Sequence, residues 1–281
     1  MEWFEALILG VIQGLTEFLP VSSSGHLVIG RELLGVEASG DLAFELIVHA
    51  ATVLSTIVVF RKQIWDLLTG FFIFRDKTSE QGKFRINDQA DYVLKIGVSM
   101  IPIFIVGVFF KDFVESLFGS LLSVGIALAV TAVLLLLSDL VGKRRAASSL
   151  ENNARNGISW WQAIVVGIGQ AFAALPGLSR SGTTIATGLI CGVRREVMAQ
   201  FSFLMVLVPI LGEAFLELIG GELAASSVGW LPLTIGFIAA FVSGVFACKV
   251  MIALVKRARL SWFALYCGVV SFIILISSFF N

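Results

Sequence analysis

The sequence predicts an all-α polytopic membrane protein, arranged as an inverted repeat of two units that each contain a re-entrant helical hairpin and three transmembrane helices. Of its 281 residues, 57% are hydrophobic and 14% are charged, whereas soluble domains contain roughly 45–50% apolar residues. Mean hydropathy is +0.94. Six apolar runs have the length of a membrane span, and two further apolar segments are interrupted by Pro, Gly and Ser near their middle.

The first predicted unit, residues 1–141, begins with a hairpin over 5–30. The motif LPVSSSG at 19–25 interrupts this hairpin and leaves arms too short to cross a hydrocarbon core, which needs roughly 17–25 helical residues. Broken helices are tolerated at membrane depth where they line a cavity or are buried in protein. The three spans of this unit are predicted near 43–60, 90–110 and 120–141.

The second predicted unit, residues 159–281, follows a cytoplasmic linker at 142–158. Its hairpin covers 161–192 and is interrupted by LPGLSRSG at 175–182. Its spans are predicted near 198–219, 229–251 and 260–279. At an offset of 157 residues, several Gly, Gln, Ser and Phe positions of the first unit match the second. This weak internal similarity favours a repeat.

Basic residues predict the orientation, because short cytoplasmic loops carry an excess of Lys and Arg. They cluster at 61–85, 143–155, 194–195 and 256–259. Placing these four clusters inside makes the second unit inverted relative to the first, and puts the N-terminus, the mouth of the first hairpin and the C-terminus outside. Inverted repeats hold ligands near the midplane, where broken helix ends converge. The two hairpin tips are therefore expected to meet.

Other features exclude several classes. Twenty Lys and Arg balance twenty Asp and Glu without a basic stripe, so no nucleic-acid partner is expected. The start Met-Glu-Trp-Phe-Glu lacks a basic region, and no removable signal peptide is predicted. Cys191, Cys248 and Cys267 lie in apolar runs with neither a disulfide nor a zinc pattern, and are expected to be packing residues.

Polar residues gather at the predicted tips. The first tip carries Gln13, Glu17, Ser22, Ser23, Ser24 and His26, and the second carries Ser179, Arg180, Ser181, Gly182, Thr183 and Thr184. A charge at the bilayer centre costs at least about 2.5 kcal/mol, so it indicates a function and a partner. A structural salt bridge between Glu17 and Arg180, with the serines as interhelical hydrogen-bonding groups, is the simpler alternative.

The run Ser-Arg-Ser-Gly-Thr-Thr suits an anion. Helix N-termini bind phosphate through free N–H groups, and an Arg fork matches phosphate oxygens. Glu17 would repel a phosphate unless a divalent cation lies between them, so Glu17 predicts a metal, Mg²⁺ or Ca²⁺, or a general base. Gln13 lies one turn before Glu17 and is expected to face the same cavity.

His26 follows the serines closely enough to activate one of them, since a hydroxyl needs an adjacent base to become a nucleophile. A structural histidine near a helix start is the alternative. Glu45 and His49 lie one turn apart in the next predicted span. They are expected to lie next to the residues that line the cavity.

GLTEFLPVSSSGH at 14–26 and PGLSRSG at 176–182 resemble the two signature motifs of the undecaprenyl-diphosphate phosphatase family, the bacitracin-resistance type. FSFLMVLVP at 201–209 is similar as well. The resemblance implies an integral membrane hydrolase that removes the terminal phosphate of a C55 polyprenyl diphosphate. The product is the carrier lipid of bacterial wall synthesis, and the process is tied to cell shape and antibiotic resistance. It further implies a bacterial inner-membrane location, a site open to the periplasmic face, and competition for the substrate by bacitracin-type compounds.

The resemblance also implies roles. Glu17, His26 and Arg180 match catalytic positions and Ser23 the nucleophile, while Ser179 and Ser181 match the phosphate-binding group. Gln13 replaces a frequent family Glu, and Cys267 stands where an Arg is expected. Either His26 or Glu17 is expected to deprotonate Ser23, or His26 is itself the nucleophile. The rival functions are a lipid transporter or flippase, which would use the same anion site, and an intramembrane serine protease.

Overall fold

The computed structural model describes residues 1–36, 42–73, 87–110, 113–114, 121–147, 155–220, 228–257 and 259–280, and all regular structure in these ranges is helical. Six helices are long and apolar enough to cross a membrane. They are α3 (Leu42–Ile73), α4 (Asp88–Phe109), α6 (Leu121–Ala147), α9 (Arg195–Gly220), α10 (Trp230–Arg257) and α11 (Ser261–Phe280). The chain is therefore a multi-pass helical membrane protein.

Each of the six predicted spans is confirmed as a helix. The largest difference is at α3, which continues to Ile73, well past the predicted end at residue 60. The extension is basic and aromatic, yet Ile64 and Leu67 pack against the buried core. Basic residues at 61–62 therefore mark a change of environment along the helix rather than its end.

The two interrupted segments form four short helices. The first gives α1 (Trp3–Phe18) and α2 (Ser23–Leu34), and the second gives α7 (Trp160–Phe172) and α8 (Arg180–Ile190). The longest of the four, α1, has 16 residues and at 1.5 Å per residue is about 24 Å long, short of a hydrocarbon core of about 30 Å.

Small residues let α1 lie directly against α10. Gly10 and Gly14 of α1 face Gly236, Ala240 and Gly244 of α10, and a Cβ atom added at Gly10 would lie 2.5 Å from the carbonyl oxygen of Gly236. Such spacings of small residues allow membrane helices to approach closely. Because α1 ends at the break of the first hairpin, this packing fixes the position of the residues near its C-terminus.

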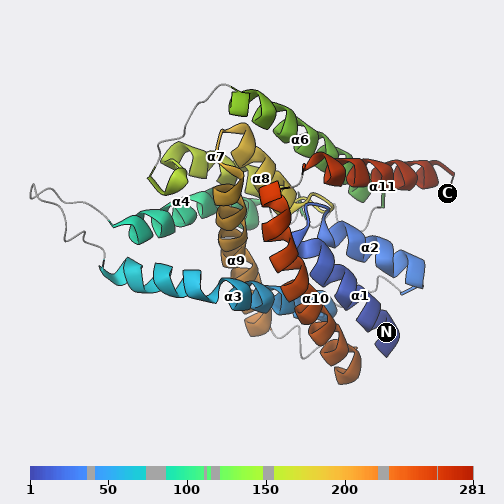
Figure 1. Cartoon of the computed structure of the whole chain (residues 1–281). Helices are drawn as coiled ribbons and strands as arrows, with labels where there is room; N and C mark the ends of the chain where they lie inside the picture. The colour runs from blue at the N-terminus through green and yellow to red at the C-terminus, as the bar shows by residue number, and fades with distance from the viewer. Residues whose placement is uncertain are drawn as a thin grey trace, which may run out of the picture.

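In Figure 1, α8 lies near the middle of the molecule, and α6, α7 and α9 are its neighbours. Helix α11 runs alongside α6. The start of α9 and the start of α11 are tied to α6 by one carboxylate: Asp139 accepts a bond from Arg195 at 2.6 Å and from the backbone N–H of Ser261 at 2.8 Å.

Most of the predicted basic cluster beyond residue 73 and the centre of the predicted linker 142–158 lie outside the described residues. The division into an inverted repeat with boundaries at 141 and 159 stays a prediction.

Candidate active site

The breaks of the two hairpins contact each other. The Ser24 hydroxyl accepts a bond from the backbone N–H of Gly177 at 3.4 Å, and the Ser181 hydroxyl donates to the carbonyl of Leu19 at 3.2 Å. Gly177 has a φ of +82°, which glycine adopts readily, and a Cβ atom there would meet the backbone of α6. Residues about 160 positions apart in sequence thus form one polar cluster.

Glu17 is the centre of this cluster. Its Oε2 accepts bonds from the Ser23 hydroxyl at 2.5 Å and from the Gln13 side-chain amide at 3.0 Å. Its Oε1 lies 3.5 Å from Nη2 of Arg180. The side chain of Glu17 is 7% exposed, and a buried carboxylate needs such partners. Three predicted site residues therefore converge on one carboxylate.

Both second arms begin with a serine N-cap. The Ser22 hydroxyl accepts a bond from the N–H of Gly25 at 3.2 Å, and the Ser179 hydroxyl accepts one from the N–H of Gly182 at 3.0 Å. The N-cap serines thus orient the first turns of α2 and α8, where Ser23 and Arg180 are the first residues. Both polar side chains consequently project from helix N-termini, which favour negative charge.

Two threonines of α8 differ in their surroundings. The Thr183 hydroxyl is buried and has no hydrogen-bond partner among the described residues. The Thr184 hydroxyl instead pairs with that of Ser202 on α9 at 2.6 Å. Thr183 therefore keeps a free hydrogen-bonding group in the first turn of α8, whereas Thr184 joins two helices.

No hydrogen bond joins His26 to Ser23 in the described part of the structure. Its Nδ1 lies 2.7 Å from the carbonyl oxygen of Ser22, and its Nε2 lies 2.7 Å from the hydroxyl of Tyr266 on α11. Of the two bases considered for Ser23, Glu17 alone is within hydrogen-bond distance in this structure. The sequence suggested either base, because His26 lies close to the serines along the chain. In the structure, Nδ1 of His26 instead binds the carbonyl oxygen of Ser22.

Glu45 and His49 lie one turn apart on α3, and His49 is near Glu17. Glu45 forms an ion pair with Arg31 at 2.6 Å, and its backbone carbonyl lies 2.8 Å from Nδ1 of His49. Because a carbonyl only accepts hydrogen bonds, Nδ1 of His49 carries the proton and Nε2 faces Glu17 Oε2, 3.9 Å away. His49 thus reaches the central carboxylate, while Glu45 orients its ring and pairs with Arg31.

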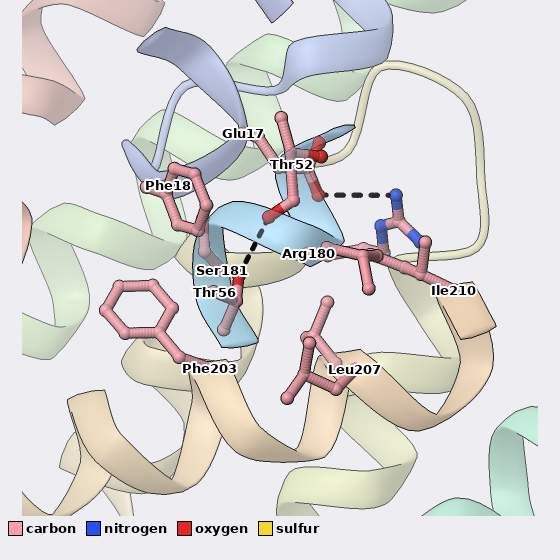
Figure 2. A pocket seen from close by; sticks show the side chains of 11 residues that line it. Glu17, Phe18, Thr52, Thr56, Arg180, Ser181, Phe203, Leu207 and Ile210 are labelled. Carbon is pink, nitrogen blue, oxygen red and sulfur yellow. Dashed lines mark hydrogen bonds and ion pairs between the residues drawn. The ribbon is translucent and has the colours of Figure 1, made fainter. Parts of the chain in front are cut away.

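A small cavity opens beside Glu17 and Arg180. Figure 2 shows Thr52 and Thr56 of α3 on one side and Phe203, Leu207 and Ile210 of α9 on the other. The cavity therefore has a polar end with one positive and one negative group, and an apolar wall. Sequence reasoning did not identify Thr52 and Thr56, because threonines that bond to their own helix are common within apolar spans.

The donor set suits a hard divalent cation only in part. Within the described residues, no group of three His, Cys, Asp or Glu side chains is arranged to hold a metal. Glu17 offers carboxylate oxygens, however, and Oε1 of the buried Gln13 has no partner among the described residues. Mg²⁺ is often bound by one or two protein oxygens together with water and substrate phosphates, and this pair of residues fits that pattern.

Comparison with known proteins identifies the family of this chain. The family model described as "Bacitracin resistance protein BacA" matches residues 6–273. A protein of Bacteroides fragilis named undecaprenyl-diphosphatase is 52% identical, with 99% of each chain covered. A protein of the same name from Parabacteroides distasonis is also 52% identical, with 96% of each covered. Undecaprenyl-diphosphatase 1 of Shouchella clausii is 34% identical over 98% of this chain and 96% of its own. The chain therefore belongs to the bacitracin resistance protein BacA family.

Proposed function

We propose that this protein hydrolyses the terminal phosphate of undecaprenyl diphosphate, which yields undecaprenyl phosphate and inorganic phosphate and returns the carrier lipid to cell-wall synthesis. The observation that carries the proposal is the short bond from the Ser23 hydroxyl to Glu17 beside the guanidinium of Arg180. A hydroxyl, a carboxylate and a guanidinium so arranged support the roles of nucleophile, base and phosphate-binding group. The names of the relatives support the same substrate.

In the first half of the reaction, Glu17 Oε2 takes the proton of Ser23 while the Ser23 oxygen attacks the distal phosphorus. The bond from that phosphorus to the bridging oxygen breaks, and the lipid monophosphate leaves. Arg180 and the backbone N–H groups at the starts of α2 and α8 stabilise the charge on the equatorial oxygens. Water then attacks the phosphoserine, Glu17 returns the proton to Ser23, and inorganic phosphate is released.

Ser22, Ser24, Ser179, Ser181, Gly182 and Thr183 form the remainder of the proposed phosphate site. Thr183 supplies a hydroxyl without a protein partner among the described residues, and the N-cap serines hold the N–H groups in place. The apolar wall formed by Phe203, Leu207 and Ile210 is the surface against which the first isoprene units would lie.

A divalent cation, Mg²⁺ or Ca²⁺, would be held by Glu17 and the free Oε1 of Gln13. When bound, it supplies positive charge that neutralises phosphate oxygens. The buried Glu17 already has Arg180, Ser23 and Gln13 as neighbours. A metal would therefore bind a carboxylate that its hydrogen-bond partners already hold in place.

We further propose that the protein lies in the bacterial inner membrane, with the first hairpin opening to the periplasmic side. The distribution of Lys and Arg supports this orientation. It can be tested with a membrane-impermeant maleimide on cysteines introduced into a cysteine-free background. Cysteine at the exposed Glu32 should react in intact spheroplasts, whereas cysteine at the exposed Arg259 should react only after permeabilisation.

The direct test of function is phosphate release from farnesyl diphosphate and from the C55 lipid by purified protein, with and without EDTA. Wild-type activity should be lost in Arg180→Ala and in Glu17→Ala, and EDTA followed by Mg²⁺ or Ca²⁺ should remove and restore it. Binding of the lipid diphosphate without phosphate release under any metal condition would reject hydrolysis and direct the test to lipid translocation.

A further inference from the structure

Tyr266 of α11 contacts the imidazole of His26 in two ways. Its hydroxyl lies 2.7 Å from Nε2 of His26. The two rings are also stacked, with centroids 5.6 Å apart and planes 14° apart. This contact joins residues 240 positions apart, and nothing in the sequence around Tyr266 indicated it.

The hydrogen bonds of His26 determine which nitrogen carries its proton. The carbonyl oxygen of Ser22 can only accept, so Nδ1 of His26 must donate to it. In the neutral ring, Nε2 is then a bare acceptor, and it receives the hydroxyl proton of Tyr266. In the charged ring, Nε2 carries a proton and donates to the same hydroxyl. Tyr266 thus satisfies Nε2 in both charge states.

The position of Tyr266 is fixed by its neighbour. The thiol of Cys267 lies fully buried, with Sγ 3.6 Å from the carbonyl oxygen of Pro20 in the break of the first hairpin. Consecutive residues of α11 therefore reach the hairpin at two points. Tyr266 itself is 46% exposed, so Nε2 of His26 meets a partly exposed hydroxyl.

We propose that Tyr266 is a positioning residue that fixes the ring plane and the Nδ1–H form of His26, a residue that matches a catalytic position of the family. This inference rests on the proposed hydrolysis. Nδ1 is bound to the carbonyl oxygen of Ser22 and Nε2 is bound to the hydroxyl of Tyr266, so both ring nitrogens have a fixed partner.

The ring contact can be tested without enzyme activity. The chain has two histidines and two tyrosines, so ¹⁵N-histidine labelling gives two imidazoles, and His49→Gln assigns them. Wild-type His26 should show the Nδ1–H form. Tyr266→Phe keeps an aromatic ring but removes the hydroxyl, and should shift the Nε2 resonance of His26 while His49 stays unchanged. Unchanged His26 resonances would overturn the proposal.

The catalytic consequence is tested by kinetics, with Tyr92→Phe as the matched control. Tyr92 is buried in α4 against Phe201, outside the site. Tyr266→Phe should lower kcat about tenfold, as expected for a misplaced catalytic group, with little change in KM. Tyr92→Phe should leave kcat unchanged. In a His26→Ala background, Tyr266→Phe should cause no further loss.

These results separate the inference from the proposed function. An inactive wild-type protein would reject hydrolysis itself, whatever the ring resonances show. An active wild type with equal kcat in both Tyr→Phe variants, or with an undiminished effect of Tyr266→Phe in the absence of His26, would reject the role of Tyr266 alone.

Discussion

Glu17 combines a structural and a chemical task in one buried side chain. It accepts hydrogen bonds from Ser23 and Gln13 and lies beside Arg180. The contacts to Gln13 and Arg180 hold the carboxylate in place, and the contact to Ser23 is the one across which a proton can move. A substitution that keeps shape but removes basicity can therefore separate the two tasks.

Glu17→Gln should retain the fold and lose turnover. The amide is isosteric but takes up no proton, so kcat should fall by roughly 10²- to 10⁴-fold, the usual contribution of a general base. Single-turnover phosphate release measures this effect, and thermal unfolding in detergent checks the fold. If Glu17→Gln kept more than half of the wild-type rate, another group would have to be the base.

Ser22 holds a backbone conformation that favours glycine. It has a φ of +70°, and such conformations cost non-glycine residues on the order of 1–3 kcal/mol. Its hydroxyl caps α2 and its carbonyl binds His26. The structure therefore retains strain at the residue that precedes Ser23, the proposed nucleophile.

Ser22→Gly and Ser22→Ala should have opposite effects on stability. Glycine relieves the strain and caps only a few tenths of a kcal/mol less well than serine, whereas alanine keeps the strain and loses about 1 kcal/mol of capping. The glycine variant should thus unfold at a higher temperature than the alanine variant. Equal unfolding temperatures in the same detergent would show that neither effect operates.

At the scale of helices, the close contact between α1 and α10 positions the carboxylate of Glu17. Gly10 and Gly14 lie on the contact face one turn apart, and Gln13 and Glu17 lie on the same helix, with Glu17 in its last turn. Since α1 is too short to cross the membrane alone, its placement depends on this packing. A side chain added at the contact should displace the site as well as destabilise the protein.

Gly14→Ala tests this dependence. The added Cβ atom would lie 2.5 Å from the carbonyl oxygen of Ala240, and overpacking costs typically about 1–3 kcal/mol. Both the unfolding temperature and kcat should fall. Gly97→Ala on α4 is the control, because a Cβ atom there meets nothing within 4 Å. Similar behaviour of the two variants would contradict a specific role of the α1–α10 contact.

At the scale of the whole molecule, Asp139 joins three long helices at one end. It accepts bonds from Arg195 of α9 and Ser261 of α11 while lying on α6. The Asp139 side chain is 3% exposed and the Arg195 side chain is 30% exposed, so the carboxylate is buried and the guanidinium is partly accessible. Thr131 of α6 binds the backbone of Ser179 and lies about two turns before Asp139. The Asp139–Arg195 pair is therefore separated from the proposed phosphate site by about two helical turns.

A double-mutant cycle of Asp139→Asn and Arg195→Gln should show a coupling of about 1 kcal/mol in the free energy of unfolding. Activity per folded molecule should stay near that of the wild type, because no site residue touches this pair. Additive effects on stability would mean that the two side chains do not stabilise each other. A specific loss of kcat would link this end of the molecule to the site.

The sequence by itself determined that the chain is a multi-pass helical protein, where its helices lie, and which polar residues belong to two interrupted segments. These properties follow from local composition: apolar length fixes the spans, and Pro, Gly and Ser interrupt them. The extension of α3 to Ile73 was missed, since basic residues suggested an end while apolar side chains beyond them still found the core.

The tertiary structure decided which of these residues meet. It brought Glu17 to Ser23 and Arg180, bound His26 to the carbonyl of Ser22, and placed Tyr266 of the last helix against the imidazole. No local pattern specifies such contacts, because they depend on how closely the helices approach and on which carbonyl takes up a ring nitrogen. The sequence thus identifies the chemical groups of the site, while the packing of helices far apart along the chain determines which groups pair.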